Sequence, residues 1–237
     1  MRKITFKSTC QLILAIAALH SAAALAVVNV ENGRSIFNDG KGEAAACIGC
    51  HGEKGLGNDA MGAPRLANVG QAYLIKQLAD FATDKRIPSG MGEAMNGFSK
   101  ALNEEDRRDL AVFLDTMEYE LESSDLKALA AEGQTVGNPE LGKIIVTQGV
   151  KGRLPVCQDC HGFNGRDGRF PAINQQKYVY LVNQLKAWRD DSRANDPVVG
   201  KIGVMRGIAK KFTDEDIYNI SAYLSTAPRI KPEEKTK

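Results

Sequence analysis

The pentapeptide Cys47-Ile48-Gly49-Cys50-His51 occurs a second time in the chain as Cys157-Gln158-Asp159-Cys160-His161. Each copy has two cysteines separated by two residues and followed directly by a histidine. Two thiols one helical turn apart can add to the two vinyl groups of one haem, and the adjacent histidine then becomes the proximal ligand of its iron. A zinc knuckle, a redox dithiol or a chance match are the alternatives for one copy alone.

The remaining cysteines and histidines distinguish between these interpretations. The chain of 237 residues has five cysteines and three histidines, and those outside the two motifs are Cys10 and His20, near the N-terminus. A closed zinc site needs four ligands, whereas each motif offers three. A thioredoxin-like dithiol would leave His51 and His161 without a role. We therefore predict two covalently bound haem c groups, attached through Cys47 and Cys50 and through Cys157 and Cys160.

Residues 1–26 have the pattern of a secretory signal peptide. Basic residues near the start are followed by an apolar stretch from Leu12 to Leu19 and by the small-residue cleavage site Ala24-Leu25-Ala26. A membrane anchor is the alternative, but His20 and Ser21 interrupt the apolar run, which is shorter than the roughly 20 residues of a spanning helix. We expect cleavage near Ala26 and a periplasmic protein, because c-type haem is attached outside the cytoplasm.

An internal repeat sets the domain organisation. Residues 95–102 match residues 205–212 at the same offset of 110 that relates the two haem motifs, and residues 73–78 match residues 180–185 at an offset of 107. The small differences in offset belong in surface loops. We predict a first domain at 27–122, a linker at 123–139, a second domain at 140–228 and a disordered tail at 229–237.

Each copy is predicted to be all-α and wrapped around its haem. Helices are expected at residues 31–38, 73–82, 140–148 and 180–188, and the linker is expected to be helical as far as Ala131. Asn103 and Thr213 are predicted to cap the last helices, with Asp106 and Asp216 three residues further on. The helix dipole stabilises negative charge in a first turn, so we interpret the carboxylates there as structural and not as acid–base groups.

A domain of roughly 90 residues has little core of its own, and a haem would enlarge it. Aromatic residues recur at matching positions of the two copies, as Tyr73, Phe81, Tyr180 and Trp188. They either pack on the haem or belong to an ordinary core.

The sixth ligand of each iron is predicted to be a methionine. Both histidines are already proximal ligands, and all four cysteines outside the signal segment are used for attachment. Met205 is the only methionine in the second domain, and the repeat places Met95 at the same position in the first domain. Met91 lies four residues before Met95 and remains an alternative ligand there. We therefore predict His51 and Met95, and His161 and Met205, as the iron ligands.

The chain resembles the cytochrome c4 family, the dihaem class I cytochromes c of the periplasm. The resemblance covers nearly all of the chain after the signal segment and is strongest in the second half. The resemblance rests on Met205-Arg206-Gly207-Ile208-Ala209-Lys210 before a capped helix and on Arg193-Ala194-Asn195-Asp196 upstream. It implies two class I cytochrome domains that face each other. It also implies that the carbonyls of Pro64 and Pro171 orient the proximal imidazoles. The acidic linker is long for this family, which leaves the relative orientation of the domains open.

Charge is divided unevenly between the two domains. Without residues 1–26 the chain has 28 basic and 29 acidic residues, so nothing indicates a nucleic-acid binder. Residues 27–122 carry a net charge of −6, with Glu104, Glu105 and Asp109 among the acidic groups, and residues 141–237 carry +7, with Lys210 and Lys211 among the basic ones. Such a dipole either orients redox partners at opposite ends or is solvated surface without a role.

The predicted function is electron transport between respiratory complexes, without enzymatic activity. By resemblance the donor is a quinol–cytochrome c oxidoreductase and the acceptor a haem–copper terminal oxidase. The partners would be redox proteins, with no small-molecule substrate, and peripheral association with a membrane is compatible with this function. A dihaem subunit of a flavocytochrome sulfide dehydrogenase or a similar complex is the alternative. A dihaem peroxidase or thiosulfate dehydrogenase would need an exchangeable or unusual iron ligand, and this sequence has no spare histidine or cysteine.

Overall fold

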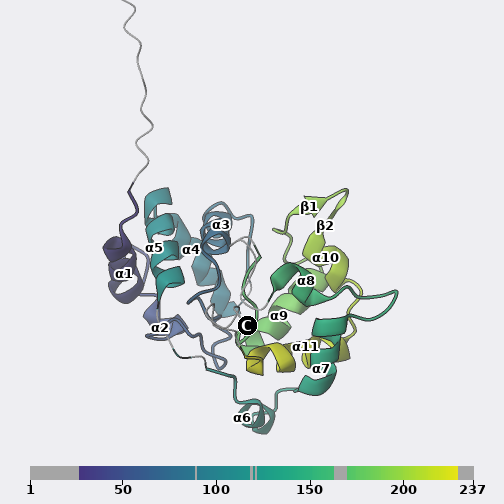
Figure 1. Ribbon diagram of the computed structural model, residues 1–237. Helices are drawn as coiled ribbons and strands as arrows, with labels where there is room; N and C mark the ends of the chain where they lie inside the picture. The colour runs from purple at the N-terminus through teal and green to yellow at the C-terminus, as the bar shows by residue number, and fades with distance from the viewer. Residues whose placement is uncertain (1–26, 89, 118–119, 121, 163–169, 229–237) are drawn as a thin grey trace, which may run out of the picture.

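The computed structural model describes residues 27–88, 90–117, 120, 122–162 and 170–228. Helices dominate this part of the chain, which confirms the all-α fold class (Figure 1). The elements of the first copy are α1 (Val30–Asp39), α2 (Ile48–His51), α3 (Gln71–Ala82), the 3₁₀ helix η1 (Gly90–Glu93), α4 (Ala94–Ala101) and α5 (Glu104–Thr116). The predicted signal peptide and tail lie outside the described residues.

The second copy repeats this order. Its elements are α7 (Pro139–Gln148), α8 (Cys157–His161), α9 (Tyr178–Arg189), β1 (Val198–Val199), β2 (Ile202–Gly203), α10 (Val204–Ala209) and α11 (Asp214–Thr226). Strands β1 and β2 form a short antiparallel hairpin in which Val198 pairs with Gly203. This hairpin lies where the second copy has its additional residues before Met205, so the insertion is a surface feature, as the repeat predicts.

The last helix of each copy begins with the predicted cap. The side chain of Asn103 accepts a hydrogen bond from the backbone N–H of Asp106, whose carboxylate accepts one from the backbone of Asn103. Thr213 and Asp216 make the same reciprocal pair at the start of α11. Each pair satisfies two backbone donors that a helix start leaves without partners. The acidic first turns therefore have the structural role that the sequence indicates.

The first and last helices of each copy cross at a glycine. A Cβ atom on Gly33 of α1 would lie 2.3 Å from the carbonyl oxygen of Asp109, and one on Gly142 of α7 would lie 1.9 Å from that of Asn219. Only glycine permits such a close approach of two backbones. These crossings complete two separate cores, one around Phe37 and one around Ile217.

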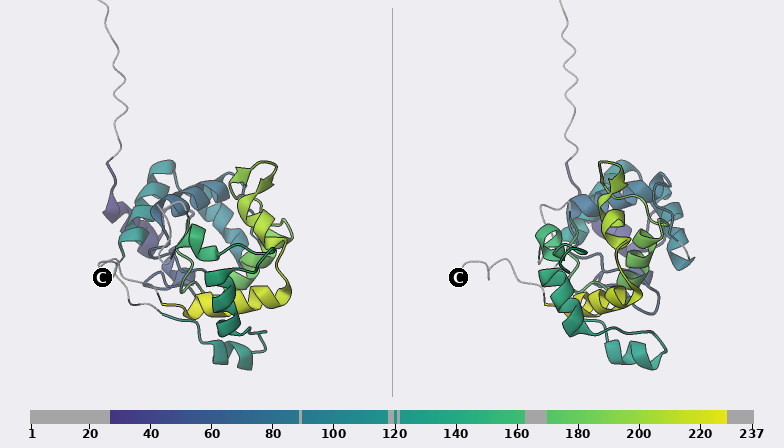
Figure 2. Two further views of the ribbon diagram at one scale, coloured as in Figure 1. Left: turned by 45° about the vertical axis from the view of Figure 1, so that its right-hand side comes forward. Right: turned by 90° about the vertical axis from the view of Figure 1, so that its right-hand side faces the viewer.

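The predicted linker packs against the second copy. Leu129 of α6 (Leu126–Ala131) is buried in the second core, and the hydroxyl of Tyr178 donates to the carbonyl of Thr135 at 2.7 Å. The backbone N–H of Ser124 also donates to the carbonyl of Ser225 at 3.2 Å. The helical end of α6 at Ala131 agrees with the sequence analysis. Figure 2 shows α6 below the two copies from two further directions.

Hydrogen bonds fix the orientation of the two copies. The carboxylate of Asp59 accepts from the backbone N–H of Val179 in the first turn of α9 at 3.0 Å. The ammonium of Lys76 donates to the carbonyl of Asn195 at 2.6 Å, and the amide of Asn195 donates to Asp80 at 2.6 Å. The two copies therefore form a polar interface that does not depend on the length of the linker.

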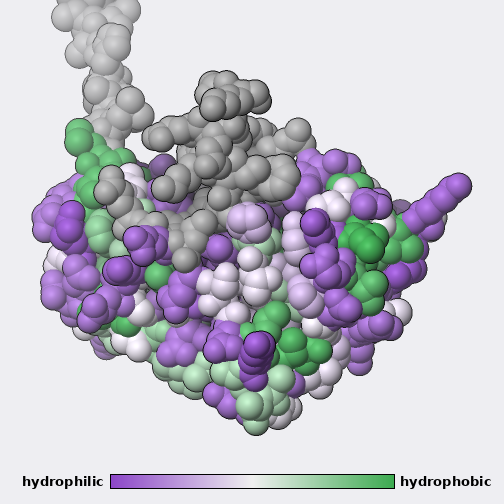
Figure 3. Space-filling model, turned by 60° about the horizontal axis from the view of Figure 1, so that its bottom comes forward, coloured by the Kyte–Doolittle hydropathy of each residue, from purple (hydrophilic) through white to green (hydrophobic). Residues whose placement is uncertain are grey.

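The outer surface is mixed. On the face shown in Figure 3, hydrophobic side chains of the described residues gather in separate patches between hydrophilic ones. Such a distribution is normal for a surface in contact with water.

Candidate haem sites

Both cysteine–histidine motifs form a single helical turn. Cys47 precedes α2, and the backbone N–H of His51 donates to the carbonyl of Cys47 at 3.0 Å. In the second copy, α8 runs from Cys157 to His161. All four cysteines are free, and the motif side chains of each copy share one short helix, as attachment to the two vinyl groups of one haem requires.

Each motif histidine is oriented by a prolyl carbonyl. Nδ1 of His51 lies 2.8 Å from the carbonyl oxygen of Pro64, and Nδ1 of His161 lies 3.0 Å from that of Pro171. A carbonyl only accepts, so Nδ1 carries the proton and Nε2 is left as the metal-binding atom. The structure thus contains the arrangement that the family resemblance implies for Pro64 and Pro171.

Burial keeps these histidines neutral. His51 is 7% exposed and His161 is 9% exposed. Burial lowers the pKa of both rings, and this effect outweighs the hydrogen bonds to the prolyl carbonyls, which act in the opposite direction. A neutral imidazole is the form that binds a metal ion.

The cysteines do not have the character of a redox pair. Burial raises the pKa of Cys47 and that of Cys157 to about 11. Reactive dithiols have a lowered thiol pKa instead. In the part of the chain that the structure describes, no group of three or more His, Cys, Asp or Glu side chains comes together as a metal site. The donor set therefore fits haem attachment better than a dithiol or a zinc knuckle.

The two predicted methionine ligands occupy matching helices. Met95 of α4 is partly buried against the first core, and Met205 of α10 is partly buried against the second. Met91 lies in η1 with 65% of its surface exposed. A hydrophobic ligand that closes a haem site must be sheltered, so the burial favours Met95 over Met91.

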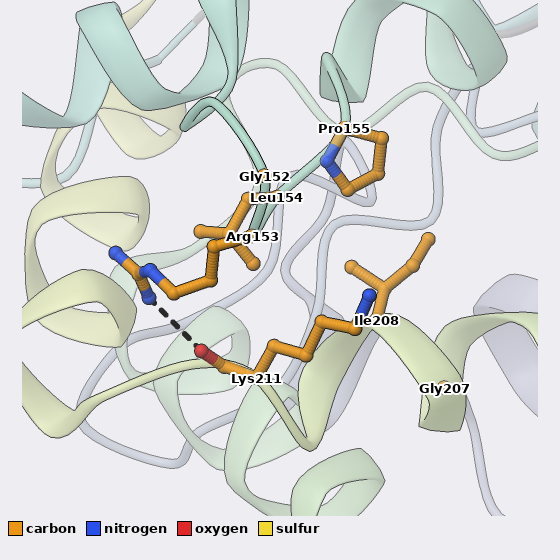
Figure 4. A pocket seen from close by; sticks show the side chains of 7 residues that line it. All are labelled: Gly152, Arg153, Leu154, Pro155, Gly207, Ile208 and Lys211. Carbon is orange, nitrogen blue, oxygen red and sulfur yellow. Dashed lines mark hydrogen bonds between the residues drawn. The ribbon is translucent and has the colours of Figure 1, made fainter.

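A shallow, open pocket of about 470 Å³ lies on the surface of the second copy (Figure 4). One wall is the segment from Gly152 to Pro155, which leads into Cys157, and the other contains Gly207 and Ile208, which follow Met205. Lys211 forms part of the rim, and its carbonyl accepts from Arg153 at 2.9 Å. The pocket therefore lies between the loop that precedes the second motif and the helix turn that follows the predicted methionine ligand.

Arg86 of the first copy is buried between the two copies. Its guanidinium donates to Gln77 at 2.7 Å, to Gln184 at 2.8 Å and to the hydroxyl of Tyr180 at 3.2 Å. The same group lies 4.6 Å from the ring centre of Phe81. Two of its partners come from the second copy, so Arg86 belongs to the interface.

Arg193 makes the symmetrical contacts from the second copy. Its guanidinium donates to Gln184 at 2.6 Å and to both Gln77 and the hydroxyl of Tyr73 at 3.1 Å. It lies 4.2 Å from the ring centre of Trp188. Each of the four recurring aromatic residues thus contacts one of two buried arginines. Tyr180 and Phe81 contact Arg86, and Tyr73 and Trp188 contact Arg193. For these four, the sequence predicts packing either on the haem or in an ordinary core.

The two guanidinium groups lack a carboxylate partner among the described residues. They share the amide oxygens of Gln77 and Gln184, which brings two like charges close together in a buried interface. Burial alone would raise the pKa of Tyr180, but the positive fields of Arg86 and Arg193 lower it to about 8. Buried cations need an anion, and the propionates of haem would supply one. The residues of both copies therefore fit one haem each.

Known proteins identify the family. The cytochrome c family model matches residues 30–118 and again residues 142–228. The chain belongs to the cytochrome c family. A thiosulfate dehydrogenase electron acceptor of Thiomonas intermedia (strain K12) is 34% identical over 193 residues, which are 78% of this chain and 80% of that protein. Cytochrome c4 of Stutzerimonas stutzeri is 33% identical over 193 residues, which are 78% of this chain and 86% of that protein.

A solved structure has the same fold. The thiosulfate dehydrogenase from Marichromatium purpuratum matches 88% of this chain with a TM-score of 0.71 and 25% identity, and the match spans 42% of that longer chain. Together with the two domain matches, these relatives place the chain among the cytochrome c4-like members of the family. It is a dihaem electron-transfer protein with two covalently bound haem c groups and redox proteins as partners. No helix of the described residues is long and apolar enough to span a membrane.

The burial of polar residues between the two domains is not predicted from the sequence. Gln77, Arg86 and Tyr73 recur as Gln184, Arg193 and Tyr180 at the offset of 107. The repeat therefore contained a signal for them, but polar residues on predicted helices are usually solvent-exposed, and their burial becomes apparent only when the two copies are brought together.

The prediction that Asp109 lies on the surface of the first domain is wrong. Asp109 is 1% exposed and accepts hydrogen bonds from the backbone of Asn29 at 3.0 Å and the side chain of Asn32 at 2.9 Å. It ties α1 to α5 and cannot contact a partner protein. Glu104 and Glu105 are exposed, as expected.

Proposed function

We propose that this chain is a periplasmic electron carrier in which His51 and Met95 ligate one haem iron and His161 and Met205 the other. The observation that carries the proposal is the likeness of the two sites. Both histidines are buried, neutral and held at Nδ1 by a prolyl carbonyl, and both methionines are sheltered in matching helices. Two closed sites suit electron transfer, because neither leaves an iron position open for a substrate.

Each bound haem supplies an iron that exchanges one electron. The residues of the chain fix the proximal imidazoles and shelter them from water, and Arg86 and Arg193 would supply positive charge for the propionates of a bound haem. The burial of His51 and His161 and the positive charge of Arg86 and Arg193 favour the reduced state, which carries one positive charge less. Rigid ligation also reduces the rearrangement that accompanies each electron transfer.

In its specific form, the proposal takes the donor to be a quinol–cytochrome c oxidoreductase and the acceptor to be a haem–copper terminal oxidase. The test is the reduction of the purified protein by the first complex in the presence of quinol, followed by its oxidation by the second. A reduced-minus-oxidised spectrum with the near-infrared sulfur-to-iron band should show two haems with methionine ligation. A protein with two haems and no such band would contradict the ligand assignment.

A second candidate is the role of electron acceptor for a thiosulfate dehydrogenase. It is supported by the relative from Thiomonas intermedia, which has that name, and by the likeness to part of the Marichromatium purpuratum enzyme. Thiosulfate and a purified thiosulfate dehydrogenase should then reduce the oxidised protein faster than the quinol-oxidising complex does. The ratio of these two rates distinguishes the candidates.

A further inference from the structure

The peptide group that follows Pro64 connects the first haem site to the second domain. The carbonyl of Pro64 accepts from Nδ1 of His51 at 2.8 Å. The N–H of the same peptide, on Arg65, donates to Oε1 of Gln176 in the second domain at 2.6 Å. One peptide unit therefore has the proximal histidine at one end and a side chain of the opposite domain at the other.

The second haem site has the reciprocal arrangement. The carbonyl of Pro171 accepts from Nδ1 of His161 at 3.0 Å. The N–H of that peptide, on Ala172, donates to the carbonyl of Val69 in the first domain at 2.9 Å. Both proximal histidines are thus hydrogen-bonded to a peptide whose other end is held across the domain interface.

The crossing is buried and held at several points. Arg65 is 2% exposed and Gln176 is 5% exposed. The amide of Gln176 also donates to the carbonyl of Arg65 at 3.0 Å, and its Oε1 accepts from the backbone of Lys177 at 2.9 Å. The guanidinium of Arg65 donates to the carbonyls of Ala172 at 2.9 Å and Gln175 at 3.2 Å. These bonds hold the two prolyl loops against each other.

A peptide responds as a unit to hydrogen bonds at its two ends. A bond donated by its N–H increases the negative charge on its carbonyl oxygen, and the effect is stronger in a buried, low-dielectric site. The carbonyl then accepts more strongly from the imidazole, which raises the basicity of the other ring nitrogen as a metal ligand. A more basic axial ligand stabilises oxidised iron and lowers the reduction potential.

We propose that the domain interface tunes each proximal histidine through the peptide after its prolyl residue. Gln176 is the positioning residue that acts on the first haem, although it belongs to the second domain. The inference rests on the proposed ligation by His51 and His161. It deepens that function, because the potential of one haem then depends on the packing of the other domain.

The test uses the full holoprotein with the Gln176→Leu substitution. Loss of the acceptor for the Arg65 N–H should shift the midpoint potential of the first haem upward and leave that of the second nearly unchanged. The Nδ1 proton of His51 should move upfield in the NMR spectrum, because its hydrogen bond weakens. Spectroelectrochemistry gives the potentials, and NMR assigns each to its haem.

Two further variants complete the experiment. Gln176→Glu places a carboxylate oxygen, a stronger acceptor of the same reach, opposite the Arg65 N–H, so it should shift the first potential downward. This variant remains informative if the leucine variant does not fold. Gln175→Asn is the matched control, because the side-chain oxygen of Gln175 is buried without a hydrogen-bond partner and asparagine tolerates the left-handed backbone of this position, where φ is 54°. It should change neither potential.

Three outcomes would overturn the inference: a shift confined to the second haem, no shift in a folded Gln176→Leu protein, or an equal shift with Gln175→Asn. The absence of histidine–methionine signatures in the unsubstituted protein would instead contradict the proposed ligation. The two failures are therefore distinguishable.

Discussion

Nη2 of Arg193 lies 3.1 Å from the hydroxyl oxygen of Tyr73, so a hydrogen bond joins two side chains that are 120 residues apart. Tyr73 belongs to α3 of the first domain, and Arg193 follows α9 of the second. Because Arg86 makes the symmetrical bond to Tyr180, the interface has an approximate two-fold axis that relates the two domains. Two positive charges, on Arg86 and Arg193, are therefore concentrated at the interface between the domains.

Removal of one of these charges should affect stability and potential together. Arg193→Leu leaves the oxygens of Gln77, Gln184 and Tyr73 without their charged donor, and we expect a loss of about 3 kcal/mol in the free energy of unfolding. Both midpoint potentials should fall, because a buried positive charge favours the reduced iron. Urea unfolding and spectroelectrochemistry measure the two effects.

The matched control is Arg189→Leu. Arg189 pairs with the exposed carboxylate of Asp214 at 2.6 Å, near the same end of α9. Exposed pairs contribute little, so this change should cost less than about 1 kcal/mol and leave the potentials unchanged. Equal effects of the two substitutions would show that the buried network has no special role.

Haem attachment is tested through the second motif. The purified protein should retain two haems after acid–acetone extraction, and Cys157→Ala with Cys160→Ala should halve the covalently bound haem. The second domain should lose more structure than the first, because Cys157 and Met205 pack against its core. Pyridine haemochrome spectra give the stoichiometry. A protein that contains metal but no haem would contradict the assignment.

The methionine ligands are tested by substitution with alanine. Met205→Ala should open one iron to carbon monoxide or cyanide and lower the potential of that haem, because a thioether ligand raises it. Met95→Ala should do the same at the other haem. The near-infrared sulfur-to-iron band should lose half its intensity in each variant.

Met91→Ala is the control for the first domain. Met91 is exposed, so its substitution should leave both spectra intact and change the free energy of unfolding by less than about 0.5 kcal/mol. Loss of the methionine band in this variant would place the ligand at Met91 and show that the repeat alignment is wrong there.

Acid should destabilise both domains by protonating the aspartate that caps the last helix of each. The carboxylate of Asp106 lies 2.5 Å from the ammonium of Lys41, and that of Asp216 accepts from Arg153 at 3.0 Å. Burial alone would raise the pKa of each carboxyl, but these hydrogen bonds and those within the helix caps hold it below its usual value. A lowered folded pKa gives stability that is complete above about pH 4 and is lost as the pH falls further.

Asp106→Asn and Asp216→Asn should each reduce the free energy of unfolding by about 1–2 kcal/mol at pH 7. The difference from the unsubstituted protein should shrink as the pH falls below about 4, because the native carboxyl then becomes protonated as well. Thermal unfolding across this pH range provides the measurement. Glu215→Gln, in the exposed part of the same first turn as Asp216, should change stability by less than about 0.5 kcal/mol at any of these pH values.

The sequence predicts the features that depend on nearby residues. The two haem motifs, the order of the helices and the caps at Asn103 and Thr213 follow from local spacing, because a helical turn and its cap span only a few positions. The repeat extends this to pairs of positions, and the family resemblance adds the prolyl carbonyls.

The contacts across the domain interface could not be predicted in this way. The bond from Arg65 to Gln176 joins residues 111 positions apart, and no local pattern shows that two polar side chains will be buried together. Asp109 illustrates the same limit in the other direction. Asp109 follows a charged first turn, in a segment whose many charged residues are typical of a solvent-exposed helix face. The close crossing of α1 over α5 nevertheless buries it.

The last prediction concerns the uneven charge of the two domains. Residues 27–122 have 10 basic and 16 acidic residues, whereas residues 141–237 have 17 basic and 10 acidic residues. Two propionates on each haem would lower both net charges by similar amounts, so the difference remains. We expect one partner to approach the acidic first domain and another to approach the basic second domain.

The dependence of the electron-transfer rates on ionic strength distinguishes this hypothesis from the alternative, in which the surface charge has no role. The Debye length is about 10 Å at 0.1 M salt and about 3 Å at 1 M, so steering by a charged domain weakens as salt is added. Rates of electron transfer with a small basic redox protein and with a small acidic one should both fall, by about tenfold or more, over this range. Stopped-flow spectroscopy at several salt concentrations measures them.

Charge reversal assigns each partner to a domain. Glu104→Lys with Glu105→Lys should slow only the basic partner, because both carboxylates are exposed on the first domain. Lys210→Glu with Lys211→Glu should slow only the acidic partner, since both lysines are exposed on the second domain and Lys211 lines its shallow surface pocket (Figure 4). Each double variant serves as the control for the other. Rates that depend on neither salt nor these reversals would show that the charge difference does not guide association, because steering is the one effect that both manipulations remove.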